Sequence, residues 1–252
     1  MSAPRRHAVV TGGGSGIGLA IARRLAAEGA RVTLMGRDAA RLERAAAELP
    51  DAAAVPADVT DPAGLARAFE RAAERGGVDI LVANAGAARS QPFLRMSAAD
   101  WGEALAVNLT GAMLCCQAVL PGMAERGWGR IVAVASTAGL SGYPYVAGYV
   151  AAKHGLVGLV RALALEFARG GVTVNALCPG YTETGLLDGA AERIAAETGR
   201  SAEQARAALL RGTPLGRFVR PEEVAAAAAW LCGEAAGSVT GQAIAIDGGE
   251  LA

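Results

Sequence analysis

Seven short apolar runs alternate with helix-like segments along the 252-residue chain, and this alternation limits the possible folds more than any other feature. The runs occupy residues 7–11, 31–35, 52–58, 79–85, 130–136, 172–177 and 241–247. Helices are predicted over residues 16–28, 39–49, 62–75, 98–126, 148–169 and 221–232. Strands that are apolar throughout and alternate with helices are typical of a parallel sheet covered on both faces. We therefore expect an α/β fold: one doubly wound, Rossmann-type domain whose seven-stranded parallel sheet binds ligands at the carboxyl ends of its strands.

The alternation shows no linker and no internal repeat, so we expect a single domain over residues 1–252. Only the segment 182–219, which is rich in Ala, Glu and Arg, departs from the pattern. It lies between a predicted strand and the last helix. We expect one or two short helices that form a lid over the site. The alternative is a solvated insertion without function.

Composition excludes several classes of function. The 24 basic residues balance the 24 acidic ones, so no global field attracts nucleic acid. No run of 18 apolar residues is present, and the amino terminus does not resemble a signal peptide, so we expect no membrane span. The four cysteines lack CxxC spacing, which favours buried, reduced thiols in a cytoplasmic protein over zinc or disulfides: Cys115, Cys116, Cys178 and Cys232.

The rarest polar residues are informative. The chain has 23 arginines but one lysine, Lys153, and it has three asparagines, Asn84, Asn108 and Asn175. Unless these exceptions arise by chance, the positions need chemistry that arginine or aspartate cannot supply.

A glycine-rich turn, Thr11-Gly-Gly-Gly-Ser-Gly-Ile-Gly18, joins the first predicted strand to the first helix. The apolar residues on both sides argue against a flexible linker. Glycines without Cβ atoms let a pyrophosphate approach the backbone, and a helix amino terminus offers free N–H groups to it. The Gly-Lys-Ser/Thr of a Walker loop is absent. The turn therefore indicates a dinucleotide site.

Tyr149 and Lys153 are spaced i and i+4, so both lie on one face of the predicted helix. Because a free tyrosine titrates near pH ~10, it is a poor acid or base at neutral pH. We expect the ammonium and a cationic nicotinamide to lower the pKa of Tyr149. Ser136, at the end of a predicted strand, can hold a substrate oxygen beside the phenol. A strand-end or helix-capping role is the alternative for this serine.

Together these motifs resemble the short-chain dehydrogenase/reductase family over essentially the whole chain. Residues 11–18 look like the cofactor turn of the family, 83–86 (ANAG) like its NAG motif, and Tyr149 and Lys153 like its YxxxK pair. The resemblance implies hydride transfer between NAD(P)(H) and a small-molecule carbonyl or secondary alcohol, and assembly as a homotetramer. It also implies that Asn108 kinks its helix and serves a proton relay, and that Asn175 is structural.

The site residues follow from the same match. The catalytic residues are expected to be Asn108, Ser136, Tyr149 and Lys153. The cofactor-binding residues are expected to be Gly12, Ser15, Gly16, Ile17, Gly18, Arg37, Asp58, Val59, Asn84, Ala85, Gly86, Tyr149, Lys153, Pro179, Gly180, Thr182 and Thr184.

The substrate is less constrained than the reaction. The sequence looks most similar to 3-hydroxybutyrate dehydrogenases and to 3-oxoacyl or polyketide ketoreductases, so a 3-oxoacyl or 3-hydroxyacyl substrate is favoured. An aromatic or alicyclic secondary alcohol is the alternative, and a non-catalytic cofactor-binding protein is a remote one.

The residues after the second predicted strand favour NADP over NAD. Gly36 stands where the family places the acid that binds the ribose 2′-OH in NAD enzymes. Arg37 follows it and could reach a 2′-phosphate, while Asp38 is expected to cap the next helix. The likeness to 3-hydroxybutyrate dehydrogenases, which typically use NAD, argues the other way.

Three further expectations concern packing. Helices 148–169 and 103–124 are apolar on more than one face, which favours pairing with copies of the same chain. His154 should point away from the site and pack against its neighbours. Tyr143 and Tyr145 could either line the substrate pocket or pack.

Overall fold

The computed structural model describes residues 5–252 and contains the predicted sheet. All seven strands are parallel, in the order β3-β2-β1-β4-β5-β6-β7. Their bounds are β1 His7–Thr11, β2 Arg31–Gly36, β3 Ala52–Pro56, β4 Ile80–Ala83, β5 Gly129–Val134, β6 Val172–Pro179 and β7 Ala243–Ile246. The prediction of one doubly wound α/β sheet is confirmed.

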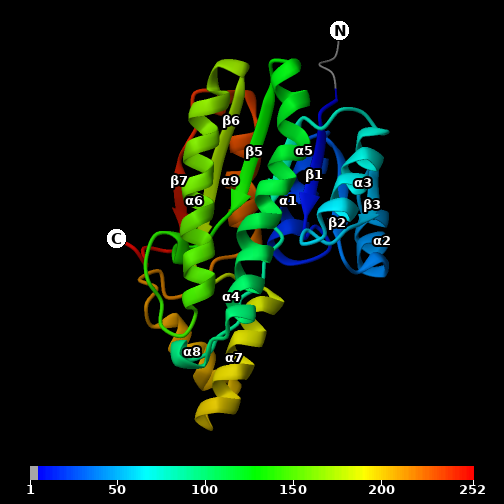
Figure 1. Ribbon diagram of the computed structural model, residues 1–252. Coiled ribbons are helices and arrows are strands. Elements are labelled where there is room, and N and C mark those ends of the chain that lie inside the picture. Colours follow the sequence, from blue (N-terminus) through cyan, green and yellow to red (C-terminus); the bar gives the residue numbers. More distant parts are fainter. Residues whose placement is uncertain (1–4) are drawn as a thin grey trace.

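Helices cover both faces of the sheet (Figure 1). One layer contains α3 (Pro62–Ala73), α5 (Gly111–Glu125) and α6 (Ala147–Phe167). The other contains α1 (Gly16–Ala27), α2 (Ala39–Ala47) and α9 (Pro221–Cys232). Each layer buries its apolar face against the strands, which gives two separate hydrophobic cores. Both faces of every central strand are therefore buried, which explains why the strands are apolar throughout.

The order of the strands reverses between β1 and β4. These neighbours pair in parallel, with Val10 opposite Val82, so the segments that follow both strands lie side by side. In doubly wound folds, ligands bind in the crevice at such a point. The glycine-rich turn after β1 and the ANAG motif after β4 meet there.

The helix predicted over 98–126 is divided into three parts. α4 (Ala98–Leu105) and α5 are joined by a π-helical turn, η2 (Ala106–Thr110), which contains Asn108. The combined helix, Ala98–Glu125, is long and apolar enough by length and composition to cross a membrane. In this structure, α5 packs on β4 and β5 as a core helix of the sheet.

Two further helices, α7 (Gly185–Thr198) and α8 (Ala202–Leu210), project beyond the carboxyl edge of the sheet (Figure 1). They pack on each other, and Thr182 and Val219 form an isolated parallel bridge at the base of the segment. The Arg193 guanidinium of α7 donates to the carbonyl oxygen of Ala88, 3.4 Å away, in the loop after β4. The two helices expected in 182–219 are thus present and reach across the carboxyl edge.

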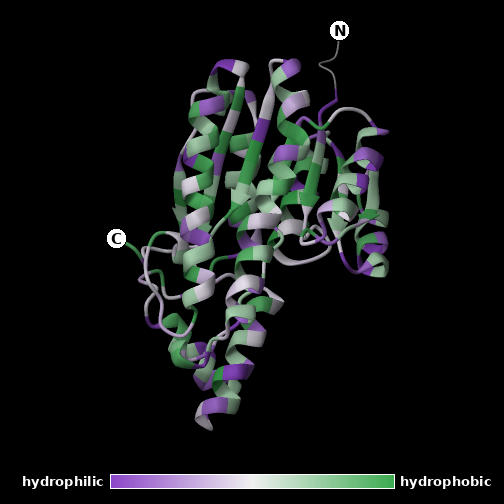
Figure 2. Cartoon of the chain, viewed as in Figure 1, coloured by the Kyte–Doolittle hydropathy of each residue, from purple (hydrophilic) through white to green (hydrophobic). Residues whose placement is uncertain are grey.

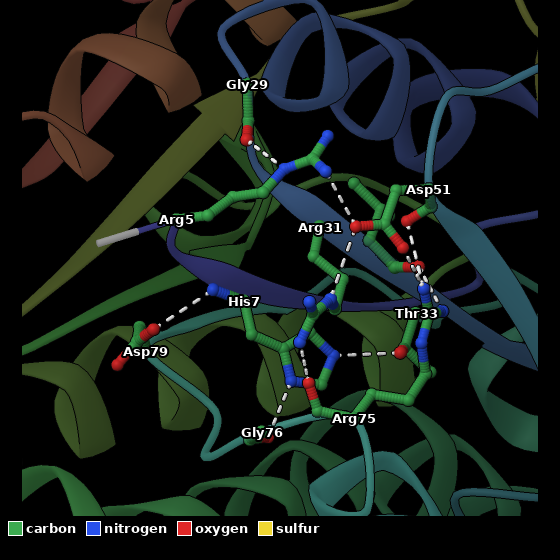
Figure 3. Close-up of polar contacts among 10 residues, drawn as sticks. Arg5, His7, Gly29, Arg31, Thr33, Asp51, Arg75, Gly76 and Asp79 are labelled. Atoms are coloured by element: carbon green, nitrogen blue, oxygen red, sulfur yellow. Dashed lines mark hydrogen bonds and ion pairs between the residues drawn. The ribbon is translucent and has the colours of Figure 1, made fainter. Parts of the chain in front are cut away.

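A polar network stabilises the opposite, amino-terminal edge of the sheet (Figure 3). Asp51 accepts hydrogen bonds from Arg5 (2.8 Å), Arg31 (3.3 Å) and Arg75 (2.6 Å). The buried His7 ring lies 2.8 Å from the Thr33 hydroxyl and 2.9 Å from the carbonyl oxygen of Gly76. These contacts tie the start of β1 to β2 and to the loop after α3.

Candidate active site

Several predicted site residues lie directly after the carboxyl ends of strands. The third, fourth and fifth strands stop at Pro56, Ala83 and Val134, earlier than predicted. Asp58 and Ser136 therefore lie in the following turns. The Asp58 carboxylate accepts from the Thr60 backbone N–H at 2.9 Å, and the Ser136 hydroxyl oxygen accepts from the Ala138 N–H at 3.1 Å. Local bonds of this kind compete with strand pairing and end the ladder.

The glycine turn is held by Asn84. The Asn84 side-chain amide donates to the carbonyl oxygens of Thr11 (2.9 Å) and Gly12 (3.3 Å). Gly12 has a φ of +63°, and a Cβ atom there would lie 2.7 Å from Asn84 Nδ2. A Cβ atom on Gly18 would lie 2.4 Å from the Gly12 carbonyl oxygen. No larger side chain fits at either position, so the tight turn depends on these glycines.

Thr11 is a member of the site that the sequence motifs did not single out. Its hydroxyl oxygen accepts from the backbone N–H groups of Asn84 (3.0 Å) and Ala85 (3.1 Å). The threonine therefore ties the end of β4 to the end of β1. Its position directly before the glycines was the only sequence signal available.

The turn fits a dinucleotide pyrophosphate. Ser15, the exposed N-cap of α1, makes no capping hydrogen bond through its side chain, so the hydroxyl is free for a ligand. Gly16 has a φ of +53°, and a Cβ atom on it would lie 3.2 Å from Thr184 Cγ2. The segment after β6 thus faces the turn across a narrow gap, and both border the helix terminus that favours phosphate.

Asn108 is buried and occupies the π-helical turn. Its Nδ2 donates to the carbonyl oxygens of Ala87 (2.9 Å) and Ala104 (3.0 Å), and its Oδ1 accepts from the Ala87 N–H (3.1 Å). The two bonds to Ala87 tie the turn to the loop after β4, and the bond to Ala104 occupies a carbonyl oxygen of α4, where the regular helix is interrupted as expected. A Cβ atom on Gly86 would lie 2.9 Å from Asn108 Oδ1 and 3.6 Å from Lys153 Nζ. The absence of a side chain at Gly86 therefore lets both groups border one space.

Ser136 and Tyr149 lie together at the carboxyl edge. Burial raises the pKa of Tyr149, and a hydrogen bond from the Ser136 hydroxyl opposes this increase. Because the Ser136 oxygen accepts from Ala138, its O–H remains available to donate toward the phenol or toward a substrate oxygen. The capping role and the role at the reacting oxygen are compatible.

Lys153 is fully buried, one helical turn after Tyr149. Its Nζ donates to the carbonyl oxygen of Val134 at 2.8 Å, where β5 ends. Burial lowers the pKa of Lys153 to about 8. A buried ammonium is costly, and this site holds one beside a tyrosine, as expected of a functional position.

The expected lowering of the Tyr149 pKa is wrong for the chain alone. The burial of the phenol outweighs the other influences on its pKa, and Lys153 is not among the groups that lower it. The ammonium points at Val134 instead. Spacing along a helix placed the two residues on one face, but burial and the direction of the ammonium depend on the tertiary structure.

Arg37 and Asp58 border a cleft of about 570 Å³ at the ends of β2 and β3. Arg67 and Arg71 of α3 also line it. The Thr60 hydrogen bonds, and to a smaller extent the Arg37 charge, lower the pKa of Asp58. Asp38 caps α2 by accepting from the Arg41 N–H at 3.0 Å, as predicted. Arg37 is therefore an exposed charge at the end of β2, while the neighbouring Asp38 side chain bonds its own helix.

The remaining predicted residues take varied positions. Ala85 and Gly86 follow β4, and Ile17 lies in the first turn of α1. Val59 is buried in the core, and a Cβ atom on Gly111 would lie 2.8 Å from its side chain. Pro179 ends β6, and the Thr182 hydroxyl donates to the Gly180 carbonyl oxygen at 3.0 Å.

Two secondary expectations are confirmed and one is wrong. Asn175 bonds the backbone at Val239 (2.7 Å) and Gln242 (3.1 Å), which is a structural role. All four cysteines are buried free thiols. His154 is exposed rather than packed, because it lies on the outer face of α6, where its ring contacts only the Val150 carbonyl oxygen at 3.0 Å.

Comparison with known proteins agrees with this geometry. The family model described as enoyl-(acyl carrier protein) reductase matches residues 12–250, nearly the whole chain. The chain belongs to the short-chain dehydrogenase/reductase family. Like other members of this family, it is an NAD(P)-dependent oxidoreductase that acts on a small-molecule carbonyl or alcohol.

Three relatives in the family illustrate the similarity. The D-beta-hydroxybutyrate dehydrogenase of Rhizobium meliloti (strain 1021) is 40% identical and aligns with 97% of this chain and 98% of its own. The granaticin polyketide synthase putative ketoacyl reductase 1 of Streptomyces violaceoruber is 42% identical over 98% and 94%. A variant of actinorhodin polyketide ketoreductase, solved with NADPH, superposes with a TM-score of 0.94 at 40% identity, covering 98% and 97%.

Proposed function

We propose that this enzyme interconverts a 3-oxoacyl and a 3-hydroxyacyl compound, with NADP(H) favoured over NAD(H). The meeting of Ser136, Tyr149 and Lys153 at the carboxyl edge of the sheet carries the proposal for the reaction. The similarity to a 3-hydroxybutyrate dehydrogenase and to ketoacyl reductases supports the substrate class.

Each residue of this group has a role in the proposed mechanism. The nicotinamide, when bound, supplies or accepts the hydride at the carbonyl carbon. Tyr149 donates its phenolic proton to the carbonyl oxygen during reduction, and Ser136 holds that oxygen by donating its hydroxyl hydrogen. Lys153 binds the ribose hydroxyls and supplies positive charge beside the phenolate that forms. Asn108 holds a water that returns a proton through Lys153.

The proposed preference for NADP(H) rests on the end of β2. Arg37 is exposed at the cleft, Gly36 carries no side chain, and Asp38 is turned toward its own helix. A 2′-phosphate beside Arg37 would gain a charge-assisted hydrogen bond without an opposing acid at position 36. The similarity to a ketoreductase solved with NADPH supports the same preference.

We also propose that the helical segment 182–219 acts as a lid. The contact from Arg193 to Ala88 connects α7 to the loop that follows β4. A segment in this place excludes water from the hydride transfer when it closes. Its contact with this loop supports the role of a lid over that of a solvated insertion.

Assembly as a homotetramer completes the proposal. In Figure 2, α5 and α6 are coloured mostly white and green, with purple segments in both helices. Leu165 on α6 is 86% exposed, beside the exposed Gly158 and Ala162. Small residues let two copies of such a helix approach closely, and pairing would bury the leucine.

The four free thiols support a cytoplasmic location.

A spectrophotometric assay tests the proposed function. Consumption of NADPH at 340 nm is followed with 3-oxo esters and thioesters, and with aromatic and alicyclic ketones as the competing class. Faster turnover of the 3-oxo compounds is expected. A clear preference for the cyclic ketones would show that the substrate is a cyclic ketone and not a 3-oxoacyl compound. No turnover of any carbonyl compound would overturn the proposed function.

A further inference from the structure

The last turn of the chain holds a carboxylate that the proposed mechanism does not use. Glu250 follows Gly248 and Gly249, which have φ values of +65° and +89°. The Asp247 carboxylate accepts from the N–H groups of Gly249 (2.9 Å) and Leu251 (3.0 Å). The chain end is therefore a structured turn, and it presents the Glu250 side chain from a fixed backbone.

The connection after the lid helices clamps this turn. The Leu215 N–H donates to the carbonyl oxygen of Gly248 at 3.0 Å. A Cβ atom on Gly248 would lie 2.8 Å from Leu215 Cβ and 2.9 Å from Thr213 Cγ2. The close packing holds the backbone of the turn that carries Glu250.

Glu250 is seated between two segments of the active site. Its Oε1 accepts a hydrogen bond from the Tyr143 hydroxyl at 2.5 Å, and Tyr143 lies in the loop between Ser136 and Tyr149. Its Oε2 lies over Gly180, where a Cβ atom would be only 2.8 Å away. The carboxylate thus bridges the catalytic loop and the segment after β6.

The second oxygen of this carboxylate is unsatisfied. Oε2 is buried and has no hydrogen-bond partner among residues 5–252. A buried carboxylate oxygen without a partner is costly, and native proteins rarely keep one without a functional reason. Burial raises the pKa of Glu250, whereas the hydrogen bond from Tyr143 favours the ionised form.

Strand register places this carboxylate near the reacting centre. Val134 at the end of β5 pairs with Leu177 of β6, so Gly180 follows β6 beside the turn that holds Ser136. Glu250 Oε2 lies against Gly180, and the Glu250 charge, after burial, raises the pKa of the next residue, Tyr181. A fixed negative charge borders the space in which the substrate must lie.

We propose that Glu250 determines the charge of the substrate: it excludes 3-oxo compounds with a free carboxylate and selects neutral amides, esters or thioesters. The proposal rests on the function proposed above and narrows its substrate class. A free 3-oxo acid would bring its carboxylate, stripped of water, close to that of Glu250, and like charges repel strongly at such a site. A neutral group avoids this repulsion.

Three compounds of similar size test the proposal. They are acetoacetate, which is anionic, methyl acetoacetate, which is neutral, and acetoacetamide, which is neutral and donates hydrogen bonds. The wild-type enzyme is expected to show kcat/KM at least about tenfold higher for the ester and for the amide than for acetoacetate. In Glu250→Gln, the ratio of ester to acetoacetate should fall at least about tenfold. Equal use of acid and ester by the wild type, or an unchanged ratio in the variant, would overturn the proposal.

Two controls separate charge selection from a structural role. Glu222→Gln makes the same change of charge at an exposed position on α9 and should keep the wild-type ratio. A merely structural Glu250 would lower the rates for acid and ester equally. If no ketone is turned over, the proposed function fails, yet quenching of NADPH fluorescence by acetoacetate and acetoacetamide still measures the charge preference. Glu250→Leu repeats the comparison if Glu250→Gln does not fold.

Discussion

The ammonium of Lys153 lies 5.6 Å from the centre of the Tyr149 ring and donates its hydrogen bond to Val134 at the end of β5. Both side chains belong to helix α6, whereas the carbonyl oxygen that accepts from the ammonium belongs to strand β5. The ammonium is thus held by a backbone carbonyl and not by another side chain. Its influence on catalysis can therefore be separated experimentally from that of the tyrosine.

The first prediction concerns Tyr149. Replacement by phenylalanine removes the proton donor and keeps the ring, so kcat should fall by about 10²–10⁴ while the cofactor still binds. Steady-state assays give kcat, and NADPH fluorescence titration gives the dissociation constant. A variant that keeps more than about a tenth of wild-type kcat would remove Tyr149 from the role of acid.

The second prediction concerns pH. Because burial lowers the pKa of Lys153 to about 8, this side chain becomes neutral above that pH, and its contacts with the ribose weaken. The kcat/KM for NADPH reports the free enzyme and should decline above about pH 8. Lys153→Arg stays charged, so its profile should lack this decline although its activity is lower. A wild-type profile that is flat to pH 9.5 would contradict the assignment.

The third prediction concerns the cofactor. Arg37→Ala should weaken NADPH binding by roughly 1.5–3 kcal/mol, the value of a hydrogen bond to a charged group, and leave NADH nearly unchanged. Dissociation constants for both cofactors measure this. Arg44→Ala, exposed on α2, is the matched control and should affect neither. Equal losses for NADPH and NADH would show that Arg37 contacts the adenosine without binding the 2′-phosphate.

The fourth prediction concerns stability. Burial lowers the pKa of His7 below its ordinary value of 6.5, and the charges of Arg75 and Arg31 lower it further. The unfolded chain therefore binds a proton at a higher pH than the folded chain does. The contribution of His7 to stability is complete above about pH 6.5 and is lost as the pH falls below it.

Chemical denaturation between pH 7.5 and 5 tests this expectation. His7→Gln should flatten the pH dependence of the unfolding free energy. The chain has only one other histidine, the exposed His154, and His154→Gln should keep the wild-type dependence. If the unfolding free energy of His7→Gln depends on pH as strongly as that of the wild type, His7 is not the cause of the pH dependence.

The fifth prediction concerns assembly. Four chains of 25.3 kDa should give a particle of about 100 kDa by light scattering. Leu165→Arg places a charge on the outer face of α6 and should yield smaller species. Leu94→Arg alters an equally exposed leucine, 96% accessible, in the η1 turn (Phe93–Arg95), and should leave the tetramer intact. A wild-type mass near 25 kDa at micromolar concentration would refute the tetramer.

Local patterns were sufficient for the fold and for the motif residues. Seven apolar runs, the glycines at 12, 16 and 18, and the spacing of Tyr149 and Lys153 report periodicity and backbone conformation, which neighbouring residues in the chain determine. The rarity of lysine and asparagine in this chain indicated further functional or structural positions, because one lysine and three asparagines stand out from the rest. The cap at Asp38 was predictable for the same reason, since one side chain and one nearby N–H decide it.

The tertiary structure alone decided what depends on burial and on contacts between distant segments. No local pattern predicted that the pKa of Tyr149 is raised, that the Lys153 ammonium points at Val134, or that His154 is exposed. Glu250 and Tyr143 are 107 residues apart, and no local pattern pairs them. Desolvation and long-range hydrogen bonds are properties of the packed chain, because they depend on which segments the fold brings together and on how much water it removes.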